Sequence, residues 1–149
     1  MNVLILRDPR ESAKKCSLTP LRGAPGVRFL EYHRERRFAV GPRILLSPEG
    51  EPLGPTDAGM DLLLIDCAWR RVPRLLAQVD GELVPRRVPP LVTAYPRASR
   101  TFADPAAGLA SVEALYAASV VLGEPHPEWL AGYRWREAFL AANPALAPG

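Results

Sequence analysis

Residues 62–65 (LLLI) form an apolar run that is followed at once by Asp66, Cys67, Ala68 and Trp69. A run of Leu and Ile without polar alternation is typical of a strand that is covered on both faces, as in a parallel α/β sheet. Ligands of such sheets bind where the strands end. We therefore predict that this strand carries Asp66 and Trp69 into a binding site. The alternative is an ordinary core strand with Trp69 packed at its end.

The rest of the chain divides into a strand-rich part and a helix-rich part. After Asp104 and Pro105, a plausible N-cap and first turn, the pattern changes to helix, and Gly123 is a natural C-cap. We therefore predict an α/β domain over residues 1–103 and a helical C-terminal domain over 104–149. The expected strands are 2–7, 27–33, 44–46, 62–66 and 91–94, and the expected helices are 109–122 and 127–142.

The length of 149 residues suits about one domain, and the composition excludes several classes of protein. Nothing approaches the roughly 18 consecutive apolar residues of a membrane-spanning helix. Two cysteines, Cys16 and Cys67, are too few for a disulfide framework, and with His33 and His126 they show no zinc-ligand spacing. We expect a cytoplasmic protein without a metal and without membrane contact.

Charge is distributed unevenly along the chain. The first 100 residues hold 17 Lys and Arg against 11 Asp and Glu, whereas residues 101–149 hold 2 against 5. Arginine binds phosphate through paired donors and stacks on bases, so the first part suits a polyanionic partner such as RNA. The alternative is that these side chains are ordinary solvated surface.

Several motifs occur in one order along the chain. They are Lys14-Lys15-Cys16-Ser17, Ser47-Pro48-Glu49-Gly50, Gly54-Pro55-Thr56-Asp57, Asp66-Cys67-Ala68-Trp69, Leu109-Ala110-Ser111-Val112-Glu113-Ala114-Leu115, and Tyr133-Arg134-Trp135 with Phe139 and Asn143. In this order they resemble the family of small-subunit ribosomal RNA (rRNA) aminocarboxypropyltransferases, which act in ribosome biogenesis. The resemblance covers nearly the whole chain. The chain departs from the family pattern at Ser12-Ala13 and at residues 95–100.

The resemblance implies a fold and an activity. The fold is a SPOUT-like knotted parallel sheet followed by an all-helical C-terminal part. The activity is transfer of the 3-amino-3-carboxypropyl group of S-adenosylmethionine (SAM) to a uridine or pseudouridine nitrogen of small-subunit rRNA, with release of methylthioadenosine. The partner is then small-subunit rRNA or a pre-ribosomal subunit, and we expect a monomer.

The resemblance also implies site residues. Trp69 walls off the sulfonium methyl group, and Ser17 with the backbone around Ile65, Leu91 and Leu109 holds the donor. Asp66 either positions the donor ammonium group or acts as a base; a third interpretation is that it caps a turn. The expected RNA-binding residues are Lys14, Lys15, Arg22, Arg70, Arg71, Arg86 and Arg87.

Two other functions remain open from the sequence. One is a SAM-dependent RNA methyltransferase on a similar scaffold. The other is a non-catalytic RNA-binding assembly factor, which would bind RNA in a salt-sensitive way without binding SAM.

Overall fold

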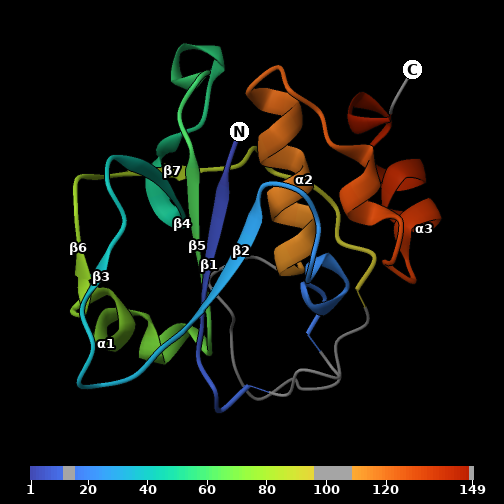
Figure 1. The fold of residues 1–149 in the computed structure, drawn as a ribbon. Coiled ribbons are helices and arrows are strands. Elements are labelled where there is room, and N and C mark those ends of the chain that lie inside the picture. Colours follow the sequence, from blue (N-terminus) through green and yellow to red (C-terminus); the bar gives the residue numbers. More distant parts are fainter. Residues whose placement is uncertain (12–15, 96–108, 148–149) are drawn as a thin grey trace.

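A five-stranded parallel sheet forms the centre of the computed structural model, which describes residues 1–11, 16–95 and 109–147 (Figure 1). The strand order is β2-β1-β5-β4-β7, and each neighbouring pair is parallel. The bounds are β1 (Val3–Arg7), β2 (Val27–Glu31), β4 (Arg43–Pro52), β5 (Leu62–Asp66) and β7 (Leu83–Arg87). The motif residues Lys14 and Lys15, the expected cap Asp104-Pro105, and the predicted domain boundary lie outside the described residues.

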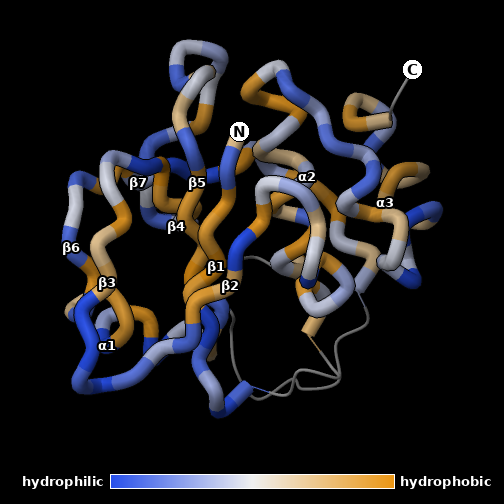
Figure 2. Tube along the Cα trace, in the orientation of Figure 1, coloured by the Kyte–Doolittle hydropathy of each residue, from blue (hydrophilic) through white to orange (hydrophobic). Residues whose placement is uncertain are grey.

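Alternate residues of the central strands enter two separate cores, as the pleat of a strand requires. Val3, Ile5 and Leu64 pack on the face covered by α2 (Ser111–Val121). Leu4 and Leu63 pack on the other face, against α1 (Val72–Leu76) and a two-stranded parallel sheet. The central strands are accordingly the apolar middle of the molecule (Figure 2), which confirms the parallel α/β sheet predicted from the 62–65 run.

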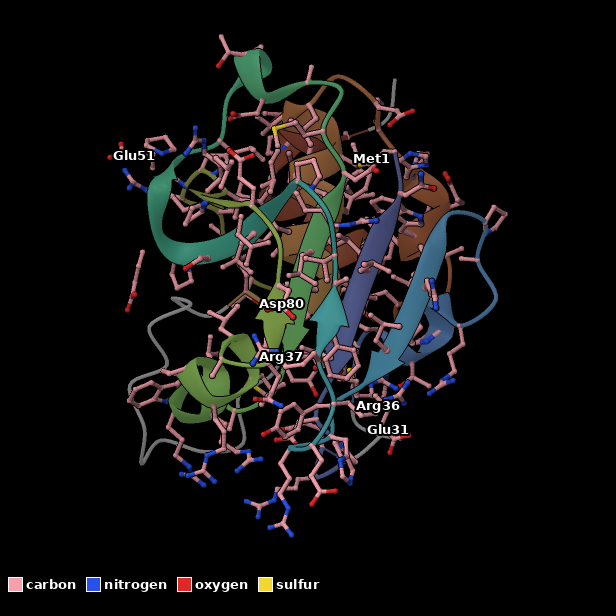
Figure 3. All side chains as sticks on the ribbon, turned by 60° about the vertical axis from the view of Figure 1, so that its left-hand side comes forward. Met1, Glu31, Arg36, Arg37, Glu51 and Asp80 are labelled. Carbon is pink, nitrogen blue, oxygen red and sulfur yellow. The ribbon has the colours of Figure 1, made fainter. Side chains whose placement is uncertain are left out.

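The smaller sheet consists of β3 (Phe38–Ala39) and β6 (Val79–Asp80). Beside it, the exposed side chains of Arg37 and Asp80 face each other, with Nε of Arg37 3.1 Å from Oδ2 of Asp80 (Figure 3). This hydrogen bond lowers the pKa of Asp80. The pair joins the start of β3 to the end of β6.

The helical segment after residue 109 shares its core with the sheet. It comprises α2, the 3-10 turn η4 (Pro127–Leu130), α3 (Arg136–Ala142) and the 3-10 turn η5 (Pro144–Leu146). Tyr116, Leu130 and Phe139 are fully buried in the same cluster as Ile5 and Leu62. In Figure 1, α2 lies between the sheet and α3.

The strand predicted at residues 91–94 is absent, and the fifth strand is β7 instead. Pro89 and Pro90 precede the predicted segment and cannot donate ladder hydrogen bonds. β7 was missed because it contains Pro85, Arg86 and Arg87, which do not resemble a buried strand. β7 lies at the edge of the sheet, where a strand tolerates proline.

The single helix predicted over residues 127–142 is also wrong, because η4 and α3 are separate. The chain turns at residues 131–135, where Gly132 lies close to Pro20. A Cβ atom on Gly132 would lie 2.7 Å from Cβ of Pro20, so a larger residue would clash there.

Gly50 of the Ser-Pro-Glu-Gly motif lies where β4 bulges against β7. The register shifts between Leu46 and Glu51, and a Cβ atom on Gly50 would come within 2.5 Å of the β7 backbone. Nearby, Gly54 donates its N–H to Asp57 at 3.1 Å, and Asp57 pairs with Arg86 at 3.2 Å. Both motifs before β5 therefore have a structural role: Gly50 allows close approach of β4 to β7, and Asp57 forms polar contacts with Gly54 and Arg86.

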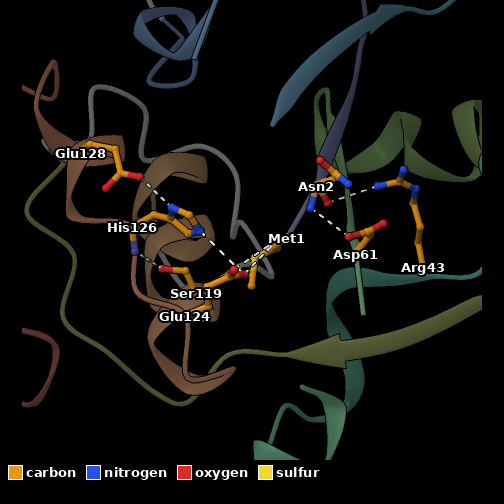
Figure 4. A network of polar contacts seen from close by, with 8 residues as sticks. All are labelled: Met1, Asn2, Arg43, Asp61, Ser119, Glu124, His126 and Glu128. Atoms are coloured by element: carbon orange, nitrogen blue, oxygen red, sulfur yellow. Dashed lines mark hydrogen bonds and ion pairs between the residues drawn. The ribbon is translucent and has the colours of Figure 1, made fainter. Parts of the chain in front are cut away.

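The amino-terminal ends of the strands are tied together by polar contacts (Figure 4). The backbone N–H of Asn2 donates to Asp61 at 2.8 Å, and Arg43 donates to the carbonyl of Asn2 at 3.2 Å. The amino group of Met1 lies 3.1 Å from Glu124, beyond the end of α2. These contacts connect β1, β4, β5 and α2 at this edge of the sheet.

Among the described helices, none is both long enough and apolar enough to cross a membrane.

Substitution of Leu115 by alanine tests the packing of α2 on the sheet. Leu115 is fully buried, so Leu115→Ala should lower the free energy of unfolding by about 2 to 5 kcal/mol. A urea denaturation curve monitored by circular dichroism measures this free energy of unfolding. The exposed Glu137 of α3 offers a control, since Glu137→Ala should change stability by less than about 0.5 kcal/mol. Equal effects of the two variants would contradict the packing.

Candidate functional site

A buried ion pair lies at the carboxyl end of the two central strands. Arg7 and Asp66 are the last residues of β1 and β5 and are direct partners in the parallel register. Nε of Arg7 donates to Oδ2 of Asp66 at 2.8 Å, and the two residues are 6% and 8% exposed. By strand alternation both side chains point to the face covered by α2. The predicted residue Asp66 is thus at a strand end, as expected, but with a charged partner that the sequence did not indicate.

Cys16 completes this cluster. Its Sγ lies 3.2 Å from Nη2 of Arg7 and 3.3 Å from Oδ2 of Asp66. Burial, with the Asp66 charge second, raises the pKa of the Cys16 thiol. Burial likewise raises the pKa of Cys67 to about 12, helped by the charges of Asp8, Glu11 and Asp66. Both thiols therefore stay protonated near neutral pH, which argues against a nucleophilic role, because the thiolate is the reactive form.

A second ion pair joins the end of β1 to the turn after β5. Asp8 is fully buried and accepts a hydrogen bond from Nε of Arg71 at 2.5 Å and one from the backbone N–H of Arg10 at 3.1 Å. Arg71 ends the 3-10 turn η3 (Trp69–Arg71). This pair fixes the turn that carries Trp69.

Trp69 begins η3 and is 49% exposed. Tryptophan side chains are highly buried on average in folded proteins. A Trp69 indole that is half exposed therefore indicates a contact with a ligand or partner rather than with the core. Its position beyond Asp66, at the strand end, leaves an aromatic face accessible to a ligand or to a nucleic-acid base.

Of the residues predicted to hold the donor, Ser17 and Leu109 lie at the start of α2, whereas the side chain of Ile65 packs on the opposite face of the sheet. Oγ of Ser17 accepts a hydrogen bond from the backbone N–H of Val112 at 3.2 Å, and Leu109 lies two residues before α2. Leu91 and Leu109 are partly buried against the same core as Cys16. Ile65 precedes Asp66 in β5.

Glu113 is a residue whose importance the sequence analysis missed. It is fully buried in α2 and accepts hydrogen bonds from Thr93, Ala94, Ala110 and Tyr133. The available signal was an acidic side chain among the apolar residues of a helix that packs on a sheet. A charge in such a place requires several partners.

The predicted RNA-binding arginines fall into two groups. Arg22 is exposed, and its guanidinium lies 5.0 Å from the centre of the Phe29 ring, which Arg7 contacts at 4.6 Å. Arg70 in η3 is also exposed. Arg22 and Arg7 both contact the Phe29 ring, so Arg22 lies near the strand ends that carry the cluster.

The other arginines of that prediction make contacts within the protein. Arg71 pairs with Asp8, Arg86 donates to both carboxylate oxygens of Asp57 at 3.2 Å, and Arg87 donates to the carbonyl of Gly50 at 2.8 Å. Arg86 and Arg87 belong to β7, which β4 separates from β5. These two side chains stabilise the far edge of the sheet.

The cluster retains one hydrogen-bond donor for a ligand. Nη1 of Arg7 is buried and has no hydrogen-bond partner in the structure. A buried donor without a hydrogen-bond partner destabilises the folded protein unless an acceptor binds to it. A carboxylate is the group that best satisfies such a guanidinium donor, and the open indole of Trp69 suits a cationic or aromatic group. Within residues 1–11, 16–95 and 109–147, no three acidic, histidine or cysteine side chains gather as a metal site would require.

The chain is similar to known proteins in both sequence and structure. No family model matches the chain. A protein of Halobacterium salinarum named 16S rRNA aminocarboxypropyltransferase is 34% identical over 103 residues, which cover 67% of this chain and 59% of that protein. The chain therefore matches less than two thirds of the length of this relative.

The fold agrees with that relationship. A solved structure from Vulcanisaeta distributa, described as the SAM-dependent rRNA:acp-transferase Tsr3, superimposes with a TM-score of 0.73 and 27% sequence identity. The match covers 96% of this chain and 78% of the other. The similarity thus extends over both the sheet and the helical segment, and sequence and structure together support the rRNA aminocarboxypropyltransferase family.

Proposed function

We propose that this protein transfers the 3-amino-3-carboxypropyl group of SAM to a uridine or pseudouridine nitrogen of small-subunit rRNA and releases methylthioadenosine. The observation that carries the proposal is the buried pair of Arg7 and Asp66 at the carboxyl ends of β1 and β5, with the half-exposed Trp69 three residues after Asp66. It lies in a fold that matches a SAM-dependent rRNA:acp-transferase over 96% of the chain.

Bound SAM supplies a sulfonium whose attached carbons are all electrophilic. In the proposed reaction a new bond forms between the rRNA nitrogen and the first carbon of the aminocarboxypropyl arm, and the bond from that carbon to sulfur breaks. The electron pair stays on sulfur in methylthioadenosine, and the nitrogen loses its proton to solvent or to a base. The protein decides which carbon reacts by deciding which one faces the acceptor, since orientation alone can supply several kcal/mol.

Trp69 is proposed to cover the sulfonium methyl group. An indole face attracts a nearby cation by about 0.5 to 2 kcal/mol. A methyl group held against the ring is withdrawn from the acceptor, so the aminocarboxypropyl arm is left to react. Ser17 and the backbone of Ile65, Leu91 and Leu109 are proposed to hold the rest of the donor.

Asp66 is proposed to position the donor by binding its ammonium group. Oδ2 of Asp66 already accepts hydrogen bonds from Arg7 and Cys16, which fix the carboxylate in place. That arrangement supports a fixed binding group better than a base that must collect a proton. Nη1 of Arg7 is the matching group for the donor carboxylate.

The RNA is proposed to lie across the arginine-bearing side of the strand ends. Arg22 and Arg70 are exposed there, and the first 100 residues carry the basic surplus of the chain. Lys14, Lys15, Arg71, Arg86 and Arg87 remain in the proposed set from the family resemblance. On the same basis we propose the SPOUT-like knot, the two-part division at residue 103, a monomer, and a cytoplasmic location.

The direct test uses SAM labelled either on its carboxyl carbon or on its methyl carbon. Incubation of the purified protein with unmodified small subunits should transfer the carboxyl label, and not the methyl label, into rRNA. Methyl label alone would identify a methyltransferase. Absence of both labels, together with undetectable SAM binding, would identify a non-catalytic assembly factor.

Replacement of Trp69 by alanine tests the donor site. Trp69→Ala should weaken SAM binding about 2- to 30-fold, the range that corresponds to the attraction of a cation by an indole. The melting temperature should change little, because half of the side chain is exposed. Isothermal titration calorimetry measures the affinity, and Trp69→Phe, which keeps an aromatic face, should lose less. Unchanged affinity, or an unfolded protein, would support the packing alternative.

Replacement of Arg22 tests the RNA face. Each phosphate contact adds about 0.9 to the slope of log affinity against log salt for a duplex and about 0.7 for a single strand. Arg22→Ala should reduce that slope by roughly one contact, whereas Arg22→Lys, which keeps the charge, should leave it unchanged. Fluorescence anisotropy with an rRNA fragment at several salt concentrations gives the slopes. Identical slopes for the wild type and Arg22→Ala would remove Arg22 from the interface.

A further inference from the structure

The Glu113 carboxylate joins two segments of chain that are distant in sequence. Oε1 accepts from Oγ1 of Thr93 at 2.6 Å and from the backbone N–H of Ala110 at 2.8 Å. Oε2 accepts from the backbone N–H of Ala94 at 2.9 Å and from the hydroxyl of Tyr133 at 3.0 Å. Each oxygen thus connects the segment after β7 to the helical part of the molecule.

The segment over residues 91–94 depends on side chains for its position. It is not a strand, and its backbone groups bond to Glu113 and to Asn143. The amide of Asn143 accepts from the N–H of Val92 at 2.9 Å and donates to its carbonyl at 2.8 Å. A loop held in this way has its geometry set by a few buried polar contacts rather than by a sheet.

The cluster around Glu113 places a hydrogen-bond donor at every contact of its side-chain oxygens. Its four partners all donate, and burial raises the pKa of Tyr133, so the phenol stays protonated as a donor. A buried charge that is fully hydrogen-bonded fixes its surroundings, and the low dielectric of the interior strengthens each bond. Glu113 itself is fully buried, so direct contact with a large substrate is excluded.

We propose that Glu113 is a positioning residue of the donor site: it sets the spacing between the backbone at Leu91 and the backbone at Leu109. This inference rests on the proposed function, in which those two segments hold SAM. Through Ala94 it fixes the first segment, and through Ala110 it fixes the second, so donor affinity depends on a side chain that does not touch the donor.

Glutamine is the informative substitution at this position. An amide offers one acceptor oxygen and one NH₂ group, whereas a backbone N–H can only donate. Because each Glu113 oxygen accepts from one backbone N–H, either orientation of the amide leaves Ala94 or Ala110 facing a second donor. Glu113→Gln therefore loosens one segment while it preserves the shape of the side chain.

The experiment compares Glu113→Gln with Tyr133→Phe, which removes one hydrogen bond from the same carboxylate but leaves both backbone segments attached. SAM affinity by calorimetry should fall at least tenfold in Glu113→Gln and less than twofold in Tyr133→Phe. With active protein, KM for SAM should rise in Glu113→Gln while KM for rRNA stays within twofold. Amide exchange at Ala94 or Ala110 should become faster in Glu113→Gln.

Each remaining outcome decides the question. A loss of SAM affinity of less than tenfold in Glu113→Gln, or an equal loss in Tyr133→Phe, would overturn the positioning role while the proposed function stands. If Glu113→Gln does not fold, Thr93→Val decides, because it keeps the side-chain shape and removes the hydroxyl that donates to Glu113 and accepts from the N–H of Tyr95. A loss of SAM affinity of threefold or more in Thr93→Val supports the role, and a smaller loss overturns it. If the wild type does not bind SAM, the proposed function fails, and the donor role of Glu113 fails with it.

Discussion

The pairing of β1 with β5 is the constraint on which the site depends. Parallel register places Arg7 beside Asp66, and both lie at strand ends on the face covered by α2. Removing one partner of such a buried pair leaves an uncompensated charge, which typically costs about 3 to 5 kcal/mol. The pair therefore links the stability of the central sheet to the geometry of the proposed donor site. Cys16 and the second ion pair, Asp8 with Arg71, extend this order to the neighbouring loops.

Part of this arrangement was predictable from the sequence. The apolar run before Asp66 indicated a strand buried on both faces, and the structure confirms a parallel sheet with that strand at its centre. Position at a strand end follows from the abrupt change of composition, so Asp66 and Trp69 were identifiable. The ordered motifs indicated the family, which the 34% identical relative supports.

Other parts were not predictable because they depend on contacts between distant residues. β7 contains Pro85 and two arginines, and its pairing with β4 depends on the bulge at Gly50. The chain at 91–94 has the composition of a strand, yet its backbone bonds go to Glu113 and Asn143. Glu113 lies in α2 and Asn143 directly follows α3, and no local pattern reveals a hydrogen bond across 20 or 51 residues.

Two kinds of interaction, strand pairing and buried side-chain hydrogen bonds, thus fix the residues around the proposed donor site. Strand register fixes Asp66, and the buried polar side chains of Glu113 and Asn143 fix the segment at 91–94 and the start of α2. We propose that this edge exposes the aminocarboxypropyl arm of SAM to RNA. The most direct measurement is the identity of the co-product formed with small subunits, by liquid chromatography and mass spectrometry. We expect methylthioadenosine in amounts equal to the modified rRNA, whereas S-adenosylhomocysteine, or no co-product, would rule out transfer of the aminocarboxypropyl arm.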